Sequence, residues 1–303
     1  MRSNTDLLRI DDTERQPGLQ PPGGVYLCQV NEQVSCGACC GLYNVADSSY
    51  PVLKRMLIDR TESFKRVPRE ADTIAAFGSH IIERQGGNPP FPDFHHCPFV
   101  GLVGKTQARV GCLLHPLAVG NGGVDYRGLS HYGGMACRVY FCPTHRKLSG
   151  EIKTVVRETA ESWYDYGMIV TEAKLLEAFF SALEQRLDAP VRAGDILKSR
   201  ECRRILRKFF QLKIDWPFRR RSALGPCHYM FDDSLYSKKN TTYPHSTGDP
   251  SPYDVIFQEL GSGFETDNDL RRGEDIIDGI IVELALQIDS GQDVRTSGGS
   301  HMS

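Results

Sequence analysis

The sequence lacks any apolar run near the ~20 residues that a membrane-spanning helix needs. Its N-terminus also lacks the basic start and apolar centre of a secretion signal. The 36 Lys and Arg nearly balance the 38 Asp and Glu, so a net charge of -2 gives the whole molecule no field that would select nucleic acid or an anionic membrane. We therefore expect a cytoplasmic protein without membrane insertion, in which any basic surface is local.

Familiar catalytic motifs are missing as well. The Gly-rich stretch from Gly120 to Gly134 precedes no Lys-Ser/Thr pair and has no strand-to-helix context, so it fits neither a phosphate loop nor a dinucleotide fingerprint. No serine lies in a nucleophile elbow, and there is no HExxH or paired-carboxylate arrangement. The sequence therefore identifies no catalytic residue.

Cysteine, in contrast, is abundant, with 10 in the chain. In a reducing compartment a cysteine cluster is more often metal-binding or catalytic than disulfide-bonded. Seven of the cysteines fall between positions 36 and 142, and we predict that they are metal ligands: Cys36, Cys39, Cys40, Cys97, Cys112, Cys137 and Cys142.

The densest part of this cluster is the run from Ser35 to Gly41. Cys36 and Cys39 have the two-residue gap that lets two thiolates turn toward one metal, and the residues between them are small. The side chains of the adjacent Cys39 and Cys40 leave the backbone in divergent directions, which suits one tetrahedral zinc poorly. They can serve two metals, or one of them is a reserve thiol.

The metal is either iron in a cluster or zinc. Cys97-Pro98 and Cys142-Pro143 are Cys-Pro steps of the kind found in ferredoxin cluster runs. One CxxC knuckle with four dispersed cysteines also resembles cluster ligation more than a zinc ribbon. These features slightly favour an iron-sulphur cluster of the 4Fe-4S type over zinc.

Two zinc ions would need eight ligands, so the seven clustered thiols would require help from a histidine or carboxylate. The histidine candidates are His95, His96, His115, His131 and His145, of which His145 forms a C-x-x-H gap with Cys142. The three remaining cysteines stand apart in the sequence, and we interpret Cys28, Cys202 and Cys227 as buried thiols.

The order of these motifs resembles a known family, the YkgJ-type zinc- or iron-chelating proteins of bacteria. The resemblance rests on the CxxCC run from Cys36 to Cys40, the step Cys97-Pro98-Phe99, the run that begins at Cys112, and the step Cys137-Arg138-Val139-Tyr140. It covers about residues 30–145 and implies metal chelation. Some relatives join a similar domain to a lysine methylase of flagellin, but this chain has no methyl-donor-binding fingerprint.

The sequence departs from that family pattern in three places. Gln33 stands where an upstream cysteine often precedes the CxxCC run, the Arg-Pro step before the fourth block is missing, and Cys142 is additional. These departures affect how many metals the site holds.

The pattern of hydrophobic residues predicts an α+β fold that is mostly α. We expect a flexible segment over 1–24, an irregular, loop-rich Cys-rich metal-binding domain with short helices over 25–150, a helical domain over 151–290 and a flexible, tag-like tail over 291–303. The predicted helices cover 52–64, 74–85, a face shared by Ile152, Val155, Val156 and Trp163, a helix capped by Thr171, and 193–212 and 274–288. Short strands are predicted over 99–103 and 108–114.

A basic segment from Arg200 to Arg221 is the one strong local charge. It could bind nucleic acid through phosphate contacts, although a solvated helix face balanced by the acidic C-terminal helix is the better interpretation.

Three further functions stay open beside simple metal binding. One is an enzyme that uses the centre to modify a protein or peptide, with a pocket lined by groups such as His131, Tyr132 or Arg138. The others are a structural-zinc interaction or regulatory protein and a redox sensor in which Cys39 and Cys40 exchange metal for a disulfide.

Overall fold

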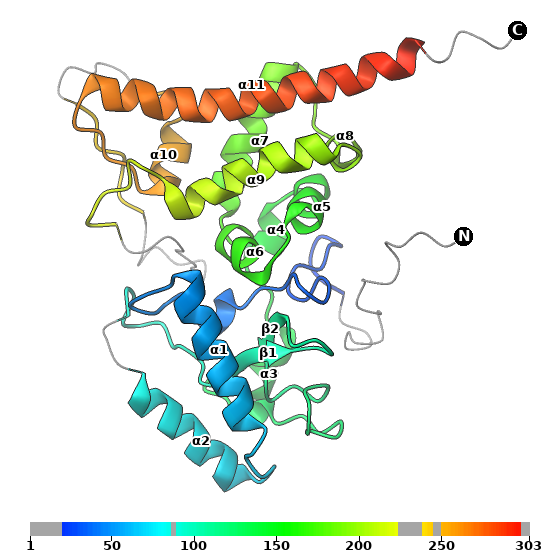
Figure 1. Cartoon of the computed structure of the whole chain (residues 1–303), viewed down its shortest axis with the longest axis vertical. Coiled ribbons are helices and arrows are strands. Elements are labelled where there is room, and N and C mark those ends of the chain that lie inside the picture. Colours follow the sequence, from blue (N-terminus) through cyan, green and yellow to red (C-terminus); the bar gives the residue numbers. More distant parts are fainter. Residues whose placement is uncertain (1–19, 86–88, 224–237, 245–249, 298–303) are drawn as a thin grey trace, which may run out of the picture. The chain divides into compact units, whose positions relative to one another are not determined.

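The computed structural model describes residues 20–85, 89–223, 238–244 and 250–297. It divides the chain into two compact units, each with its own core (Figure 1). Unit 1 comprises residues 1–145 and 161–171, and unit 2 comprises 146–160 and 172–303. The predicted division into independent domains at residue 150 stays a prediction, since the chain passes between the units more than once.

Unit 1 is built on two helices and a hairpin. Helix α1 (Tyr50–Phe64) and helix α2 (Ala71–Arg84) contribute aromatic side chains to one cluster. The ring centroid of Phe64 lies 5.1 Å from that of Phe77 and 6.3 Å from that of Phe99, both at steep angles. Such edge-to-face contacts add to the free energy gained by burying the rings.

The hairpin pairs strand β1 (Val100–Val103) with the antiparallel strand β2 (Arg109–Cys112). Val100 lies opposite Cys112, and Val103 lies opposite Arg109. The hairpin is fixed to α1 because the Thr61 hydroxyl accepts a hydrogen bond from the Leu102 N–H at 2.7 Å. Both strands fall where the sequence predicted them.

Short helical turns occupy the rest of unit 1, where the sequence suggested mostly loops. They are η3 (Ala38–Cys40), η4 (Arg127–Leu129), α3 (Gly133–Val139), α4 (Thr144–Lys147, which ends just beyond the unit) and α6 (Trp163–Ile169). Tyr166 of α6 is fully buried and donates its hydroxyl proton to the Leu27 carbonyl at 2.7 Å.

Unit 2 is helical in its described residues. Its helices are α5 (Gly150–Thr159), α7 (Ala173–Leu187), α8 (Ala193–Leu197), α9 (Arg200–Asp215), α10 (Asp254–Leu260) and α11 (Asp267–Ser297). Figure 1 shows α11 running beside α9. Helix α11 also contacts α7, and α9 contacts α8 and α5. Phe179 of α7 stacks on Phe209 of α9 with 3.8 Å between the ring centroids.

Several predicted helices begin or end at other residues than the observed ones. The face predicted from Ile152 to Trp163 is broken between α5 and α6, where Ser162 caps a new helix by accepting from the Asp165 N–H. The predicted helix 193–212 is likewise two helices, because the Ser199 hydroxyl accepts from the Cys202 N–H at 3.2 Å and starts α9. Helix α7 is preceded by Glu172 rather than capped by Thr171.

The last helix is longer than expected. Helix α11 begins at Asp267 and continues to Ser297, so its first turn carries Asp267 and Asp269, and residues 291–297 of the predicted tail are helical. The predicted fold class is confirmed, because the described residues are mostly helical with one two-stranded antiparallel sheet. Within the described residues, every helix is too short or too polar to cross a membrane.

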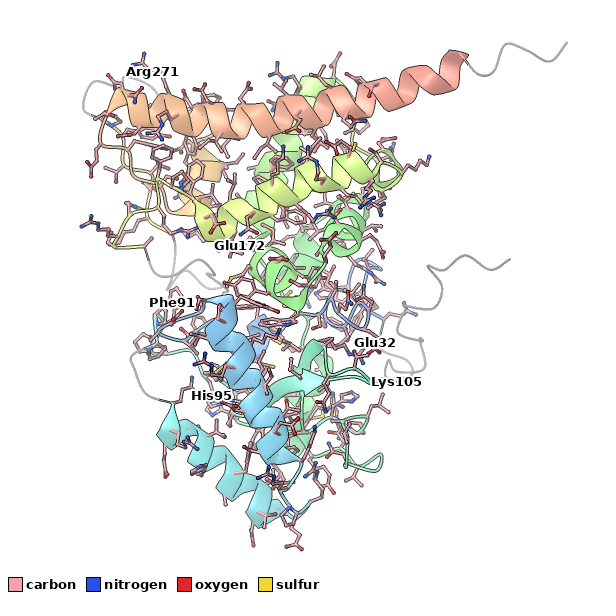
Figure 2. All side chains as sticks on the ribbon, in the orientation of Figure 1. Glu32, Phe91, His95, Lys105, Glu172 and Arg271 are labelled. Carbon is pink, nitrogen blue, oxygen red and sulfur yellow. The ribbon has the colours of Figure 1, made fainter. Side chains whose placement is uncertain are left out.

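An ionic cluster lies inside unit 2. Glu172 is 2% exposed, and one of its carboxylate oxygens lies 2.9 Å from the Lys213 ammonium and also pairs with Lys238 (Figure 2). Lys238 in turn pairs with Glu259. Burial raises the pKa of Glu172, but the charges of Lys213 and Lys238 together outweigh burial and lower this pKa to about 2.

Glu172→Gln is expected to destabilise unit 2 by about 3–5 kcal/mol, because removal of one partner leaves a buried charge uncompensated. The urea midpoint can be followed through Trp216, which is buried in unit 2, in a Trp163→Phe background that removes the other tryptophan. Since the pKa of Glu172 is lower in the folded protein, its contribution is complete well above the ordinary pKa of 4.5 and declines as the pH falls toward 2. The difference between wild type and variant should therefore shrink over that range.

Glu201→Gln is the matched control, since Glu201 pairs with Arg204 on the exposed surface of α9. It should leave the midpoint almost unchanged. Equal effects of the two substitutions would contradict the importance of the buried cluster.

Candidate metal centre

The cysteine run forms a tight loop around η3. The Cys40 N–H donates to the Gly37 carbonyl at 3.1 Å, and Gly41 closes the turn with a φ of 72°. A Cβ atom at Gly41 would lie 2.4 Å from the His95 carbonyl oxygen, and one at Gly37 would lie 2.8 Å from a methyl carbon of Val110. The loop therefore needs glycine at both ends, because the backbone is pressed between β2 and the segment at His95.

A second tight turn precedes this loop and carries Cys28. The Cys36 N–H donates to the Cys28 carbonyl at 2.8 Å, and Gln29 and Ser35 form an antiparallel bridge. The Ser35 hydroxyl accepts from the Val110 N–H at 2.8 Å, which attaches the turn to β2. The expectation that Cys28 stands apart from the cluster is therefore wrong, since backbone pairing brings it beside Cys36.

Four thiols lie near this turn and the loop around η3. Burial raises the pKa of Cys28 and of Cys36 well above the ordinary value, and the charges of Cys39 and Cys142 raise each pKa further. Burial also raises the pKa of Cys142, again with a contribution from Cys39. These mutual effects place the four thiols near one another, and we call them group A: Cys28, Cys36, Cys39 and Cys142. Cys39 also raises the pKa of Cys97, so group A adjoins the second set of thiols.

His145 contacts group A through Cys142. Its ring is completely buried, and its Nε2 accepts a hydrogen bond from the Leu27 N–H at 3.3 Å. The proton of the neutral imidazole must then be on Nδ1, which lies 3.5 Å from the Cys142 sulfur and donates to it. Both ring nitrogens of His145 thus have partners, and the contact with Cys142 orients and stabilises that thiol. A role of His145 as an additional metal ligand stays a prediction.

Three other thiols gather around the aromatic cluster of unit 1. The Cys97 N–H donates to the Cys40 carbonyl at 2.8 Å, and Cys112 ends β2 opposite Val100. The side chains of Cys40, Cys97 and Cys112 all pack in or against the cluster that contains Phe64, Phe77 and Phe99.

Cys137 of α3 completes this second set. Burial raises the pKa of Cys97 to about 11 and that of Cys112 to about 12, and the charge of Cys137 contributes to both. Tyr126 connects the aromatic cluster with the region of α3. Its side chain packs against the cluster, and it immediately precedes η4, which contacts α3. We call these four thiols group B: Cys40, Cys97, Cys112 and Cys137.

The two groups adjoin at the neighbouring residues Cys39 and Cys40. A hydrogen bond between their side chains lowers the pKa of Cys39 and raises that of Cys40, so Cys40 is the donor. Burial raises the pKa of Tyr132, and the charges of Cys39, Cys40 and Cys97 raise it further, so this phenol lies close to the junction. Adjacent residues thus belong to different groups of thiols.

An arginine without a carboxylate partner lies beside group B. Arg60 is 3% exposed, and its guanidinium donates to His96 Nε2 at 2.7 Å, to the Cys97 carbonyl at 3.2 Å and to Gln85 at 3.2 Å. Burial lowers the pKa of Arg60 to about 10, and a thiolate at Cys97 opposes that change. An anionic centre built from thiolates would supply the negative charge that Arg60 lacks.

The other histidine candidates have contacts of their own. The His95 ring stacks on the His131 ring with 3.9 Å between centroids, and Tyr132 meets both edge-on (Figure 2 labels His95). Burial lowers the pKa of His95 to about 4 and that of His96 to about 3, so both are neutral at pH 7. His115 uses Nδ1 to accept from the Leu117 N–H.

The thiols fit a thiophilic metal by their chemistry, because two sets of four cysteines are what zinc or an iron-sulphur cluster takes. All nine cysteines in the described residues are free thiols, while Cys227 lies outside them. As they stand, no three His, Cys, Asp or Glu side chains of the described part of the chain are close enough to hold a metal ion. Binding would therefore require the thiols of each group to close inward.

Two further predictions concern the helical part of the chain. Cys202 is completely buried in α9, as expected for a thiol outside the cluster. The basic segment that begins there is largely engaged within unit 2, because Arg204 and Lys208 pair with Glu283 and Lys213 with Glu172. This favours the interpretation of a balanced helix face, and binding of nucleic acid stays a prediction.

No family model, no curated protein and no solved structure matches this chain. The likeness to YkgJ-type proteins thus rests on the cysteine motifs alone and stays a prediction.

Gly41→Ala is expected to destabilise unit 1 and to disturb both groups. The positive φ costs about 1–2 kcal/mol for an alanine, and the contact with the His95 carbonyl should add about 1–3 kcal/mol. Gly122→Ala is the control, since Gly122 also has a positive φ of 57° but nothing within 4 Å of an added Cβ. The urea midpoint can be followed through Trp163 in a Trp216→Phe background, and equal losses for both variants would show that the loop is not pressed against His95.

Proposed function

We propose that unit 1 is a metal-binding module with two adjacent four-thiolate centres, one in group A and one in group B. The observation that carries the proposal is the packing of Cys40, Cys97 and Cys112 in or against the aromatic cluster, while backbone pairing holds Cys28 beside Cys36 in the turn that precedes Cys39. Neighbouring residues cannot easily ligate one tetrahedral ion, but they suit two centres side by side. The addition of Cys28 supplies the eighth thiol, so no histidine is required.

Iron-sulphur clusters are the favoured occupants, with zinc as the alternative. Each group contains one Cys-Pro step, Cys142-Pro143 in group A and Cys97-Pro98 in group B, as in the cysteine runs of two-cluster ferredoxins. The buried Arg60 beside group B also suits a centre with net negative charge. A bound cluster would supply electron transfer, whereas zinc would supply cross-linking or Lewis acidity.

The protein's own residues prepare the thiols for such a centre. Burial raises the pKa of Cys36 and of Cys112, so binding of a metal must release protons from these thiols and should strengthen as the pH rises. The hydrogen bond from His145 favours the charged form of Cys142, and Arg60 favours that of Cys97. The enzyme, structural-zinc and redox-sensor alternatives all need this same metal-binding step.

The test is the metal and acid-labile sulphide content of protein purified without oxygen, together with its visible spectrum. The wild-type protein should carry about eight irons with matching sulphide, or two zinc ions and no sulphide. Cys28→Ser should remove the group A centre alone, and Cys112→Ser the group B centre alone, so each variant should retain about half of the metal. Cys202→Ser, a buried thiol in unit 2, should retain all of it.

Two results would contradict the proposal. Folded wild-type protein that contains no metal and takes up none would remove it altogether. Loss of all metal in both Cys28→Ser and Cys112→Ser, with Trp163 fluorescence still that of the folded unit, would indicate one shared centre instead of two.

A further inference from the structure

The four thiols of group B are held very unequally. Cys97 is 8% exposed, and Cys40 and Cys112 pack against the aromatic cluster and are fixed by backbone hydrogen bonds of the loop and the hairpin. Cys137 alone among the nine described cysteines is exposed. Cys40, Cys97 and Cys112 are therefore fixed by the surrounding fold, whereas Cys137 is at the surface.

The helix that carries Cys137 is itself weakly anchored. Helix α3 has only seven residues, and none of them is buried. Met135 is 75% exposed and Val139 49% exposed, so neither side chain holds the helix to the core. The Tyr132 side chain does not cap the N-terminus of α3, and the first residue of the helix, Gly133, has a positive φ of 75°.

Within the described part of the chain, two side chains of α3 make polar contacts with neighbouring segments. Arg138 Nε donates to Asp125 Oδ2 at 2.8 Å, and the Arg138 side chain is 42% exposed. The Ser130 hydroxyl lies 3.2 Å from the Cys137 sulfur. Asp125 is largely buried and also pairs with Arg127, so Arg138 is the exposed member of this group of charges. Because the Arg138 side chain is exposed, loss of its ion pair should cost little free energy, and α3 can then move away from the other three thiols.

We propose that Cys137 is the exchangeable ligand of group B, through which metal enters and leaves the centre. The inference rests on the proposed function, because it assigns a route to a site that must first exist. In release, the bond between the metal and the Cys137 sulfur breaks, the sulfur takes a proton from water, and a donor atom of the incoming ligand takes the open position. The metal keeps its oxidation state throughout.

Group A offers no comparable ligand. Its thiols Cys28, Cys36, Cys39 and Cys142 are all at least partly buried. Cys142 is also held by the hydrogen bond from the completely buried His145. Exchange at group A should therefore be slower than at group B.

The experiment uses full-length protein loaded with two equivalents of Zn(II), treated with a chromogenic zinc chelator. Release should occur in two phases, and the faster phase should be absent from Cys112→Ser. Arg138→Gln should accelerate that phase by about two- to fivefold, since it removes the ion pair that holds α3. Arg186→Gln is the control, because Arg186 has a similarly exposed side chain and forms an ion pair with Asp278 in unit 2, and it should leave both phases unchanged.

Alkylation of the zinc-loaded protein, read by peptide mass spectrometry, gives an independent measurement. Cys137 should be modified first, and its modification should coincide with release of one zinc ion. Wild-type protein that takes up neither zinc nor iron would overturn both the proposed function and this inference. Bound zinc with Cys137 protected as well as Cys40, Cys97 and Cys112, or an unchanged release rate in Arg138→Gln, would overturn this inference alone.

Discussion

The arrangement of the cysteines in unit 1 depends on the close packing of the loop that carries the neighbours Cys39 and Cys40. Gly37 and Gly41 allow this loop to lie against Val110 and His95. The two thiols hydrogen-bond to each other, with Cys39 near the turn at Cys28 and Cys40 against the aromatic cluster. Further thiols come from β2 (Cys112), from α3 (Cys137) and from the segment before α4 (Cys142).

Burial of so many thiols has an electrostatic consequence. Burial raises the pKa of most of these thiols, among them Cys36 and Cys112, and a thiolate that forms raises the pKa of its neighbours. Positive groups beside them include Arg60 near Cys97, Arg127 near Cys112 and an imidazole proton of His145 beside Cys142. These groups cannot stabilise eight thiolates, so a stable deprotonated state needs additional positive charge of the kind that metal ions carry.

Local sequence patterns predicted most elements but not their contacts. Hydrophobic periodicity found α1, α2 and both strands, yet it merged α8 with α9, because the cap at Ser199 is a single hydrogen bond within a continuous apolar pattern. The seven clustered cysteines were recognised by spacing. Cys28 was missed because its proximity to Cys36 comes from backbone pairing across a tight turn, which leaves no spacing motif. The short helix α3 was missed because it begins among glycines.

The aromatic cluster bears on what a metal would do in unit 1. In a small zinc finger the metal replaces a core, and the chain unfolds without it. Here Phe64, Phe77 and Phe99 already form a core that positions Cys40, Cys97 and Cys112 through ordinary packing and hairpin hydrogen bonds. A metal at group B would therefore bind to thiols whose backbone positions are set before it arrives, and the side chains would then close inward on it. Such an arrangement suits a centre whose metal reacts or exchanges better than one whose purpose is to hold the chain together.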